Sequence, residues 1–209
     1  MTLLSFTALL RGSDRVSAVG TLGPQGTSSE AAARHFIRLS GSDGSLPPVH
    51  LFDTYEAAGA ALREGQVTHV IVANAYSAVN QFYMDPDLAL ANVFVLDTPL
   101  YGIAVPPNAA VPDAPTIATH PAPEPIIDQL LPRRHSTCLL YTCRHSTYKV
   151  IHSTSTSAAA QAASDGIADL ALTTVPSAEL NGLEFISDTR PILMVWSVFT
   201  RVEPPARTA

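Results

Sequence analysis

Charged residues, cysteines and long apolar runs are all scarce in this chain of 209 residues. The net charge is −6 at pH 7, and no long basic run is present. A nucleic-acid partner needs a concentrated positive face, so we expect none to bind. No apolar run reaches the roughly 18 residues that a membrane span requires, and the mild acidity does not favour anionic membranes. The apolar segment 3–10 has no basic residue before it, so we expect residues 1–15 to form a tail rather than a signal peptide.

The two cysteines, Cys138 and Cys143, lie five positions apart and have no second pair. We therefore expect no disulfide framework and a reduced, cytoplasmic protein. The surrounding segment repeats His-Ser-Thr three times, at His135, His145 and His152. A zinc site is one interpretation of this segment, but structural zinc sites use closely spaced ligand pairs that it does not contain. We expect no metal and no cofactor. We expect this segment to be a polar loop with its arginines in solvent.

Three familiar catalytic motifs are also missing. The chain contains no G-x-S-x-G nucleophile elbow, no P-loop and no G-x-G-x-x-G turn. Its carboxylates are sparse, and Asp53, Asp97 and Asp169 stand at expected element ends, where caps and turns explain them. An anionic ligand would therefore have to be held by local donors, because the overall charge does not attract it.

Hydrophobic residues make up 46% of the chain, and apolar runs alternate regularly between strand-like and helical patterns. Such alternation predicts an α/β protein with parallel sheets and helices on both faces. The strands fall into two sets, before and after about Asp97, and the last strand is long enough to return to the first set. We expect lobe 1 at 16–98 plus 188–209, lobe 2 at 99–187, and a ligand cleft between them. After the opening strand and helix, strands are expected at 49–52, 69–73, 93–96, 101–105, 116–119, 148–151, 168–173, 183–186 and 192–199, and helices at 55–63, 76–84, 123–131, 158–164 and 176–181.

The stretch Val19–Phe36 reads as a strand, a tight glycine turn and a helix start. Thr27 and Glu30 have the S/T-x-x-E spacing of a capping box. Gly26 allows a close backbone approach, and the helix start offers N–H groups, two hydroxyls and a positive dipole end to an anion. The alternative is an ordinary capped helix after a turn.

Two further helix starts have the same chemistry, at His120 and at Ser155-Thr156-Ser157. If the three point into one cleft, they form an anion site without arginine. Tyr76 follows a strand directly and either faces that cleft or belongs to the core, whereas Tyr83 is expected to be a core residue with a satisfied hydroxyl. Trp196 and Met194 either pack in the core or end at the cleft.

The motifs resemble those of prephenate dehydratases. Gly23–Ser29 resembles the G-P-x-G-T-x-S opening, and the His120-Pro121 turn and the Ser155–Ala160 start resemble later motifs of that family. The resemblance implies the two-lobed, type 2 periplasmic-binding-protein-like fold of the dehydratase catalytic domain, with prephenate in the cleft. Two departures stand out: Ala75-Tyr76-Ser77 replaces Glu-Asn-Ser, and the last strand, 192–199, has no Thr-Arg pair. No ACT regulatory domain is expected.

A closer resemblance is to the non-aromatising prephenate decarboxylases of bacilysin- and anticapsin-type pathways. It rests on Asn74-Ala75-Tyr76, Phe82–Leu88, Asp97–Gly102 and Trp196–Arg201. It implies a carboxy-lyase that keeps the 4-hydroxyl of prephenate, and a homodimer. The alternatives are a dehydratase that yields phenylpyruvate and a non-catalytic small-molecule-binding protein.

The site expected from these patterns has two kinds of residue. The first kind holds the substrate: hydroxyls and helix starts bind its carboxylates, and apolar side chains help to desolvate the leaving carboxylate. The second kind provides or orients a proton, although water or the substrate could also supply it. The binding residues are Gly26, Thr27, Ser28, Ser155, Thr156, Met194 and Trp196, and the catalytic candidates are Tyr76 and His120.

Overall fold

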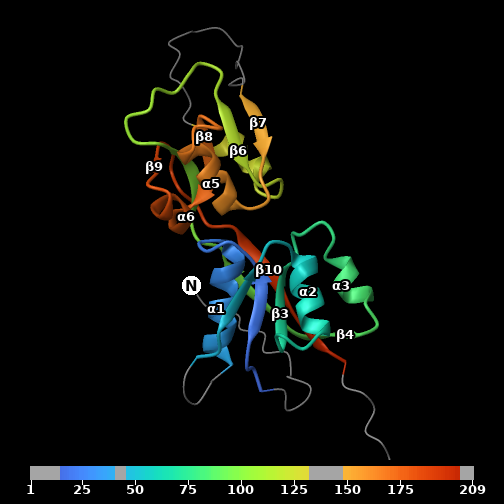
Figure 1. Cartoon of the computed structure of the whole chain (residues 1–209). Coiled ribbons are helices and arrows are strands. Elements are labelled where there is room, and N and C mark those ends of the chain that lie inside the picture. The colour runs from blue at the N-terminus through green and yellow to red at the C-terminus, as the bar shows by residue number, and fades with distance from the viewer. Residues whose placement is uncertain (1–14, 41–45, 132–147, 203–209) are drawn as a thin grey trace, which may run out of the picture. The chain divides into compact units, whose positions relative to one another are not determined.

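The computed structural model describes residues 15–40, 46–131 and 148–202, which divide into two compact units, each with one five-stranded sheet (Figure 1). Unit 1 contains the described residues before 25, those in 28–98, and 193–202. Unit 2 contains 25–27 and the described residues in 99–192. None of the helices in the described ranges is long and apolar enough to cross a membrane.

The sheet of unit 1 has the strand order β2-β1-β3-β10-β4. Strands β1 to β3 are parallel, whereas β10 runs antiparallel to both β3 and β4. The crossovers from β1 to β2 and from β2 to β3 run in opposite directions, so right-handed connections place α1 and α2 on opposite faces, as Figure 1 shows. The elements are β1 Val19–Leu22, α1 Ser28–Leu39, β2 Val49–Phe52, α2 Tyr55–Arg63, β3 His69–Ala73, α3 Asn80–Met84, β4 Leu88–Asp97 and β10 Leu193–Arg201.

Unit 2 repeats this plan with the strand order β7-β6-β8-β5-β9. Strands β6, β7 and β8 are parallel, and β5 is antiparallel to both β8 and β9. The elements are β5 Tyr101–Val105, β6 Thr116–Thr119, the 3-10 turn η1 Glu124–Ile126, α4 Ile127–Leu130, β7 Lys149–His152, α5 Thr156–Ser164, β8 Leu170–Thr174, α6 Val175–Leu180 and β9 Glu184–Phe185.

Buried apolar side chains cover both faces of the sheet in unit 2. Alanines 159, 160 and 163 of α5 are fully buried and let that helix approach one face closely. Larger residues, among them Ile117 of β6 and Ile127 of α4, fill a second cluster. Both faces are therefore dry, and polar groups gather at the ends of the strands.

Two predictions about the fold were wrong in detail. The sheets are mixed rather than parallel, because strands such as β10 and β5 enter without a crossover helix, which antiparallel pairing does not require. The helix expected over 76–84 begins only at Asn80, since the preceding residues form turns. The predicted alternation and the return of the last strand to the first sheet are confirmed. The division into lobes with a substrate cleft stays a prediction.

Candidate active site

In unit 2, the parallel strands β6, β7 and β8 end at one edge of the sheet. His120 follows β6 directly, the start of α5 follows β7, and α6 follows β8. The structure therefore brings His120, Ser155 and Thr156 to the same edge, as expected for carboxyl ends of parallel strands. Residues 25–27 also pack with this unit, which adds Gly26 and Thr27.

Ser155 is the N-cap of α5. Its backbone is extended, and its Oγ accepts a hydrogen bond from the Ala158 N–H at 3.0 Å. This bond uses the oxygen as an acceptor, so the O–H proton remains able to donate. Thr156 is buried, and its carbonyl accepts from Thr173 Oγ1 at 2.8 Å. The start of α5 is thus a fixed, hydroxyl-bearing helix N-terminus.

Three hydroxyls of unit 2 hold the turn at 25–27. Ser157 Oγ donates to the Gln25 carbonyl at 2.7 Å. Thr174 Oγ1 and Ser177 Oγ lie 3.0 and 2.9 Å from the Gly26 carbonyl oxygen. Our sequence reasoning missed Thr174 and Ser177, although two hydroxyl residues three positions apart at a strand-to-helix junction could have indicated them.

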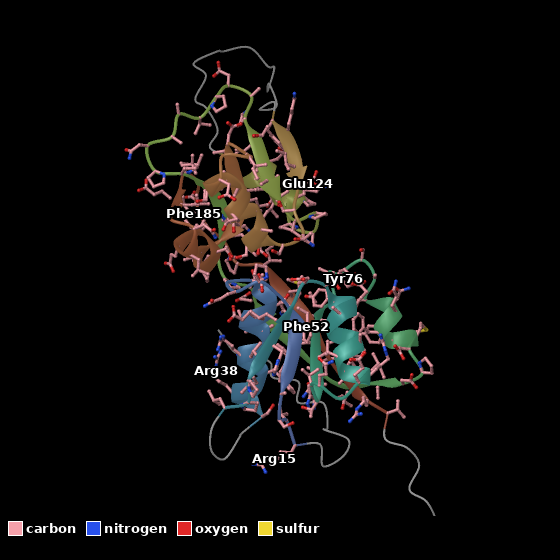
Figure 2. All side chains as sticks on the ribbon, in the orientation of Figure 1. Arg15, Arg38, Phe52, Tyr76, Glu124 and Phe185 are labelled. Carbon is pink, nitrogen blue, oxygen red and sulfur yellow. The ribbon has the colours of Figure 1, made fainter. Side chains whose placement is uncertain are left out.

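The His120 ring is held in one tautomer. Its Nδ1 lies 3.1 Å from the Ala122 N–H and accepts from it, so Nε2 carries the proton. Burial, and then the neighbouring His152, hold the pKa of His120 below its usual value. His152 is itself paired with Glu124 at 2.7 Å (Figure 2 labels Glu124). At neutral pH, His120 is therefore an uncharged donor rather than a strong acid.

In unit 1, the predicted residues also stand where parallel strands end. Ser28 is the first residue of α1, and Thr27 comes directly before it. The Glu30 carboxylate, which we assigned to the capping box, accepts a hydrogen bond from Arg34 Nη2 at 2.7 Å. Ser29 Oγ lies 2.7 Å from the buried Tyr55 hydroxyl, and this hydroxyl also accepts from the Ala73 N–H at 3.3 Å. Tyr55 thus links the start of α1 to the end of β3.

Tyr76 lies beside the start of α2 (Figure 2). Its ring packs against Tyr55 with centroids 4.8 Å apart, and its hydroxyl donates to the Glu56 carboxylate. Burial and the Glu56 hydrogen bond raise the pKa of Tyr76 to about 12. The phenol proton is therefore retained at neutral pH and directed toward Glu56.

Tyr83 differs from its prediction in burial. Its side chain is 38% exposed, so it is not a core residue. Its hydroxyl is satisfied, as expected, by Ser197 Oγ at 2.5 Å, and Ser197 donates to Asn74 Oδ1 at 2.7 Å. Tyr83 lies near the end of the short helix α3, and its ring packs edge-on against Phe199 of β10 with centroids 5.1 Å apart.

Met194 and Trp196 stand on β10 beside the carboxyl end of β3, where Trp196 pairs with Ala73. Met194 is partly buried, and Trp196 is only 1% exposed. Within the described part of the chain, the indole Nε1 is the one buried side-chain nitrogen or oxygen without a hydrogen-bond partner. This side chain, expected to act through its apolar surface, therefore also carries an unused donor.

No group of three His, Cys, Asp or Glu side chains that could hold a metal occurs among the described residues. His135, Cys138, Cys143 and His145, which invited the zinc interpretation, lie outside those residues.

Comparison with known proteins gives relatives over most of the chain. No protein-family model matches it. A prephenate decarboxylase of Planktothrix agardhii is 40% identical over 182 residues, which covers 87% of this chain and 86% of that protein. The fold resembles that of a prephenate dehydratase from Arthrobacter aurescens, solved with L-Phe, with a TM-score of 0.61 and 18% identity over 91% of this chain and 62% of that chain. A periplasmic substrate-binding protein of an ABC transporter from Coxiella burnetii gives a TM-score of 0.53 and 14% identity over 88% of this chain and 84% of that chain. The two structural likenesses confirm the predicted fold class.

Proposed function

Because the chain belongs to the prephenate decarboxylase family, we propose that it removes the ring carboxylate of prephenate as CO₂ and keeps the 4-hydroxyl. The product is a dihydro-4-hydroxyphenylpyruvate. The similarity to a prephenate decarboxylase over most of both chains is the observation that carries this proposal.

The reaction needs one proton and no oxidant. The bond between the ring carbon and the carboxylate breaks, and its electron pair forms a new ring double bond. The neighbouring alkene pair shifts and takes a proton at its far carbon. Loss of the 4-hydroxyl would instead give an aromatic ring, so the enzyme must withhold a strong acid from that oxygen.

The two titratable candidates fit this requirement. His120 is neutral, with Nδ1 occupied by the Ala122 N–H. Tyr76 keeps its proton, with the hydroxyl turned to Glu56. We propose that both orient the substrate or the incoming proton by hydrogen bonding, and that neither drives the hydroxyl out as water.

Substrate binding is assigned to the helix starts. We propose that Thr27, Ser155 and Thr156 donate to the carboxylates, with Ser28 and the Gly26 turn beside them. Ser155 supports this role because its cap bond to Ala158 leaves the hydroxyl proton for a ligand. We assign Met194 and Trp196 to the desolvation of the leaving carboxylate.

Incubation with prephenate at neutral pH tests the function. Proton NMR of the product distinguishes three results. Olefinic signals with a retained hydroxyl-bearing ring carbon are expected for the decarboxylase, aromatic signals of phenylpyruvate would indicate a dehydratase, and recovered prephenate would indicate a binding protein. Release of CO₂ accompanies both reactions, so the retained hydroxyl decides between them.

We further propose that the protein acts in the cytoplasm, as a homodimer, in the biosynthesis of a specialised metabolite. A chain with two cysteines suits a reducing compartment. The dimer rests on the family resemblance alone. Light scattering after size exclusion measures it, and a mass of 22.1 kDa would contradict it.

A further inference from the structure

The carbonyl group of Gly26 is held by two hydroxyls that have no other evident task. Ser177 Oγ donates to it at 2.9 Å, and Thr174 Oγ1 lies 3.0 Å from both this oxygen and Ser177 Oγ. Thr174 and Ser177 are fully buried. All of these contacts lie within unit 2.

Local helix chemistry alone would place the Thr174 hydroxyl elsewhere. Thr174 is the N-cap residue of α6, yet its side chain makes no capping hydrogen bond. A threonine N-cap normally stabilises its helix by accepting a hydrogen bond from an N–H of the first turn, and α6 lacks this bond. By contrast, Ser155 at the start of α5 caps its helix in the usual way. The Thr174 hydroxyl is therefore directed to the Gly26 carbonyl at the expense of its own helix.

The backbone at Gly26 is adapted to this contact. Its φ is +87°, a conformation that side-chain-bearing residues rarely adopt. A Cβ at this position would also come within 3.1 Å of Ser177 Oγ and 3.0 Å of Leu180 Cδ1. The turn thus lies directly against α6, and only glycine fits it.

Anchoring the carbonyl fixes the residue that follows. The Gly26–Thr27 peptide is planar and trans, so the direction of its carbonyl sets the direction of its N–H and the position of the Thr27 Cα. Ser157 fixes the preceding peptide in the same way through the Gln25 carbonyl at 2.7 Å. Three side chains of unit 2 therefore fix the backbone position from which the Thr27 side chain projects.

We propose that Ser177 and Thr174 are positioning residues for substrate binding, which act through the Gly26 carbonyl on Thr27. This inference rests on the proposed function. It assigns part of the affinity for prephenate to two residues that no substrate atom needs to touch.

The test uses Ser177→Ala and Thr174→Val, with Thr174→Ser as the conservative rescue. The matched control is Thr116→Val. Thr116 Oγ1 donates to Asp169 at 2.6 Å at the amino end of β6, in the same unit but at the opposite edge. We expect Ser177→Ala and Thr174→Val each to raise KM for prephenate by about five- to tenfold, the effect of one hydrogen bond, with a smaller change in kcat. Thr174→Ser and Thr116→Val should leave KM unchanged.

A double-mutant cycle then separates positioning from general destabilisation. In a Thr27→Val background, Ser177→Ala should raise KM no further, because both changes act through the same hydroxyl. An equal rise in both backgrounds, or an unchanged KM for both single variants, would overturn the proposal. If Ser177→Ala does not fold, the same cycle is made with Thr174→Val, which keeps the volume of the side chain. Failure of the unmodified protein to convert prephenate would overturn the proposed function and this inference with it, whereas conversion with unchanged KM in the variants would overturn this inference alone.

Discussion

The two units have the same strand plan but use equivalent positions differently. In each, the second parallel strand leads into a helix with a hydroxyl N-cap: Thr54 accepts from the Ala57 N–H at 3.0 Å, and Ser155 accepts from the Ala158 N–H at 3.0 Å. Thr54 is exposed, whereas Ser155 is 3% exposed. A cap alone does not require burial, so burial distinguishes Ser155 from Thr54 and supports the binding role that we propose for Ser155.

The two sheet edges also differ in chemistry. The edge of unit 2 carries hydroxyls, a helix start and a neutral histidine, all groups that can donate to an anion. The edge of unit 1 has hydroxyls at the start of α1, but near the end of β3 it also has the aromatic side chains of Tyr55, Tyr76 and Trp196. We therefore propose a division of work, in which hydroxyls and helix starts bind the carboxylates and aromatic side chains supply an apolar surface for the loss of CO₂.

The strongest test of this division compares the two caps. Asp is as good an N-cap as Ser or Thr, so Ser155→Asp and Thr54→Asp should both keep their helices. Only Ser155→Asp replaces a donor with a negative charge at the proposed binding edge. We expect this variant to raise KM by about 10- to 100-fold, because it loses a hydrogen bond to a charged group of the substrate. Steady-state kinetics and thermal unfolding measure both effects. Equal KM values for the two variants would show that the caps are equivalent and that Ser155 binds nothing.

A second test uses pH and His120. The pKa of this ring is lowered by burial and by His152, so the neutral form dominates at pH 7. Protonation would turn Nδ1 into a donor facing the Ala122 N–H, and we expect kcat/KM to fall about tenfold per pH unit below the folded pKa. Because the native ring binds its proton less tightly than the unfolded one, its contribution to stability is complete above pH of about 6.5 and is lost as the pH falls toward the folded pKa.

The variant His120→Asn should lose this acidic limb of the pH profile. His35 is the matched control, because burial and then Arg38 also lower its pKa, while it packs against Phe94 in unit 1. His35→Asn should keep the limb. A profile that changes only in the His35 variant would remove His120 from the site.

A third test concerns Tyr76 and its partner. Tyr76→Phe should lower kcat by about five- to tenfold, which corresponds to the loss of one hydrogen bond, with little change in KM. Glu56→Gln removes the carboxylate that helps to raise the pKa of Tyr76, so the basic limb of the kcat profile should move to lower pH. Tyr148 is the control, since its hydroxyl donates to Asp128 at 2.9 Å and its pKa is likewise raised to about 12. If Tyr148→Phe and Tyr76→Phe gave the same kcat, Tyr76 would have no part in the reaction.

Local patterns in the sequence predicted most of the helices and strands, because these elements are determined by residues that are close together in the sequence. The strand at His69–Ala73 and the helix at Tyr55–Arg63 follow from apolar runs bounded by caps and glycine, and both have the predicted bounds. Strand direction was not accessible, since the antiparallel entry of β10 depends on pairing with residues more than 90 positions away. The anchoring of Gly26 by Ser177 was missed for the same reason, because the two residues are 151 positions apart.

The smallest expected effect is at Trp196, the single tryptophan of the chain. Sequence reasoning left its role between core packing and substrate contact. An orphaned donor costs about 1–3 kcal/mol, which Trp196→Phe removes, but the smaller ring leaves a cavity, so the two effects on the free energy of unfolding oppose each other and the net change should be small. We expect turnover of prephenate to fall about threefold, and the intrinsic fluorescence of the unmodified protein to respond to prephenate in stopped-flow mixing. Unchanged kinetics together with silent fluorescence would place Trp196 in the core only, and would leave Tyr76 as the main evidence that unit 1 takes part in the chemistry.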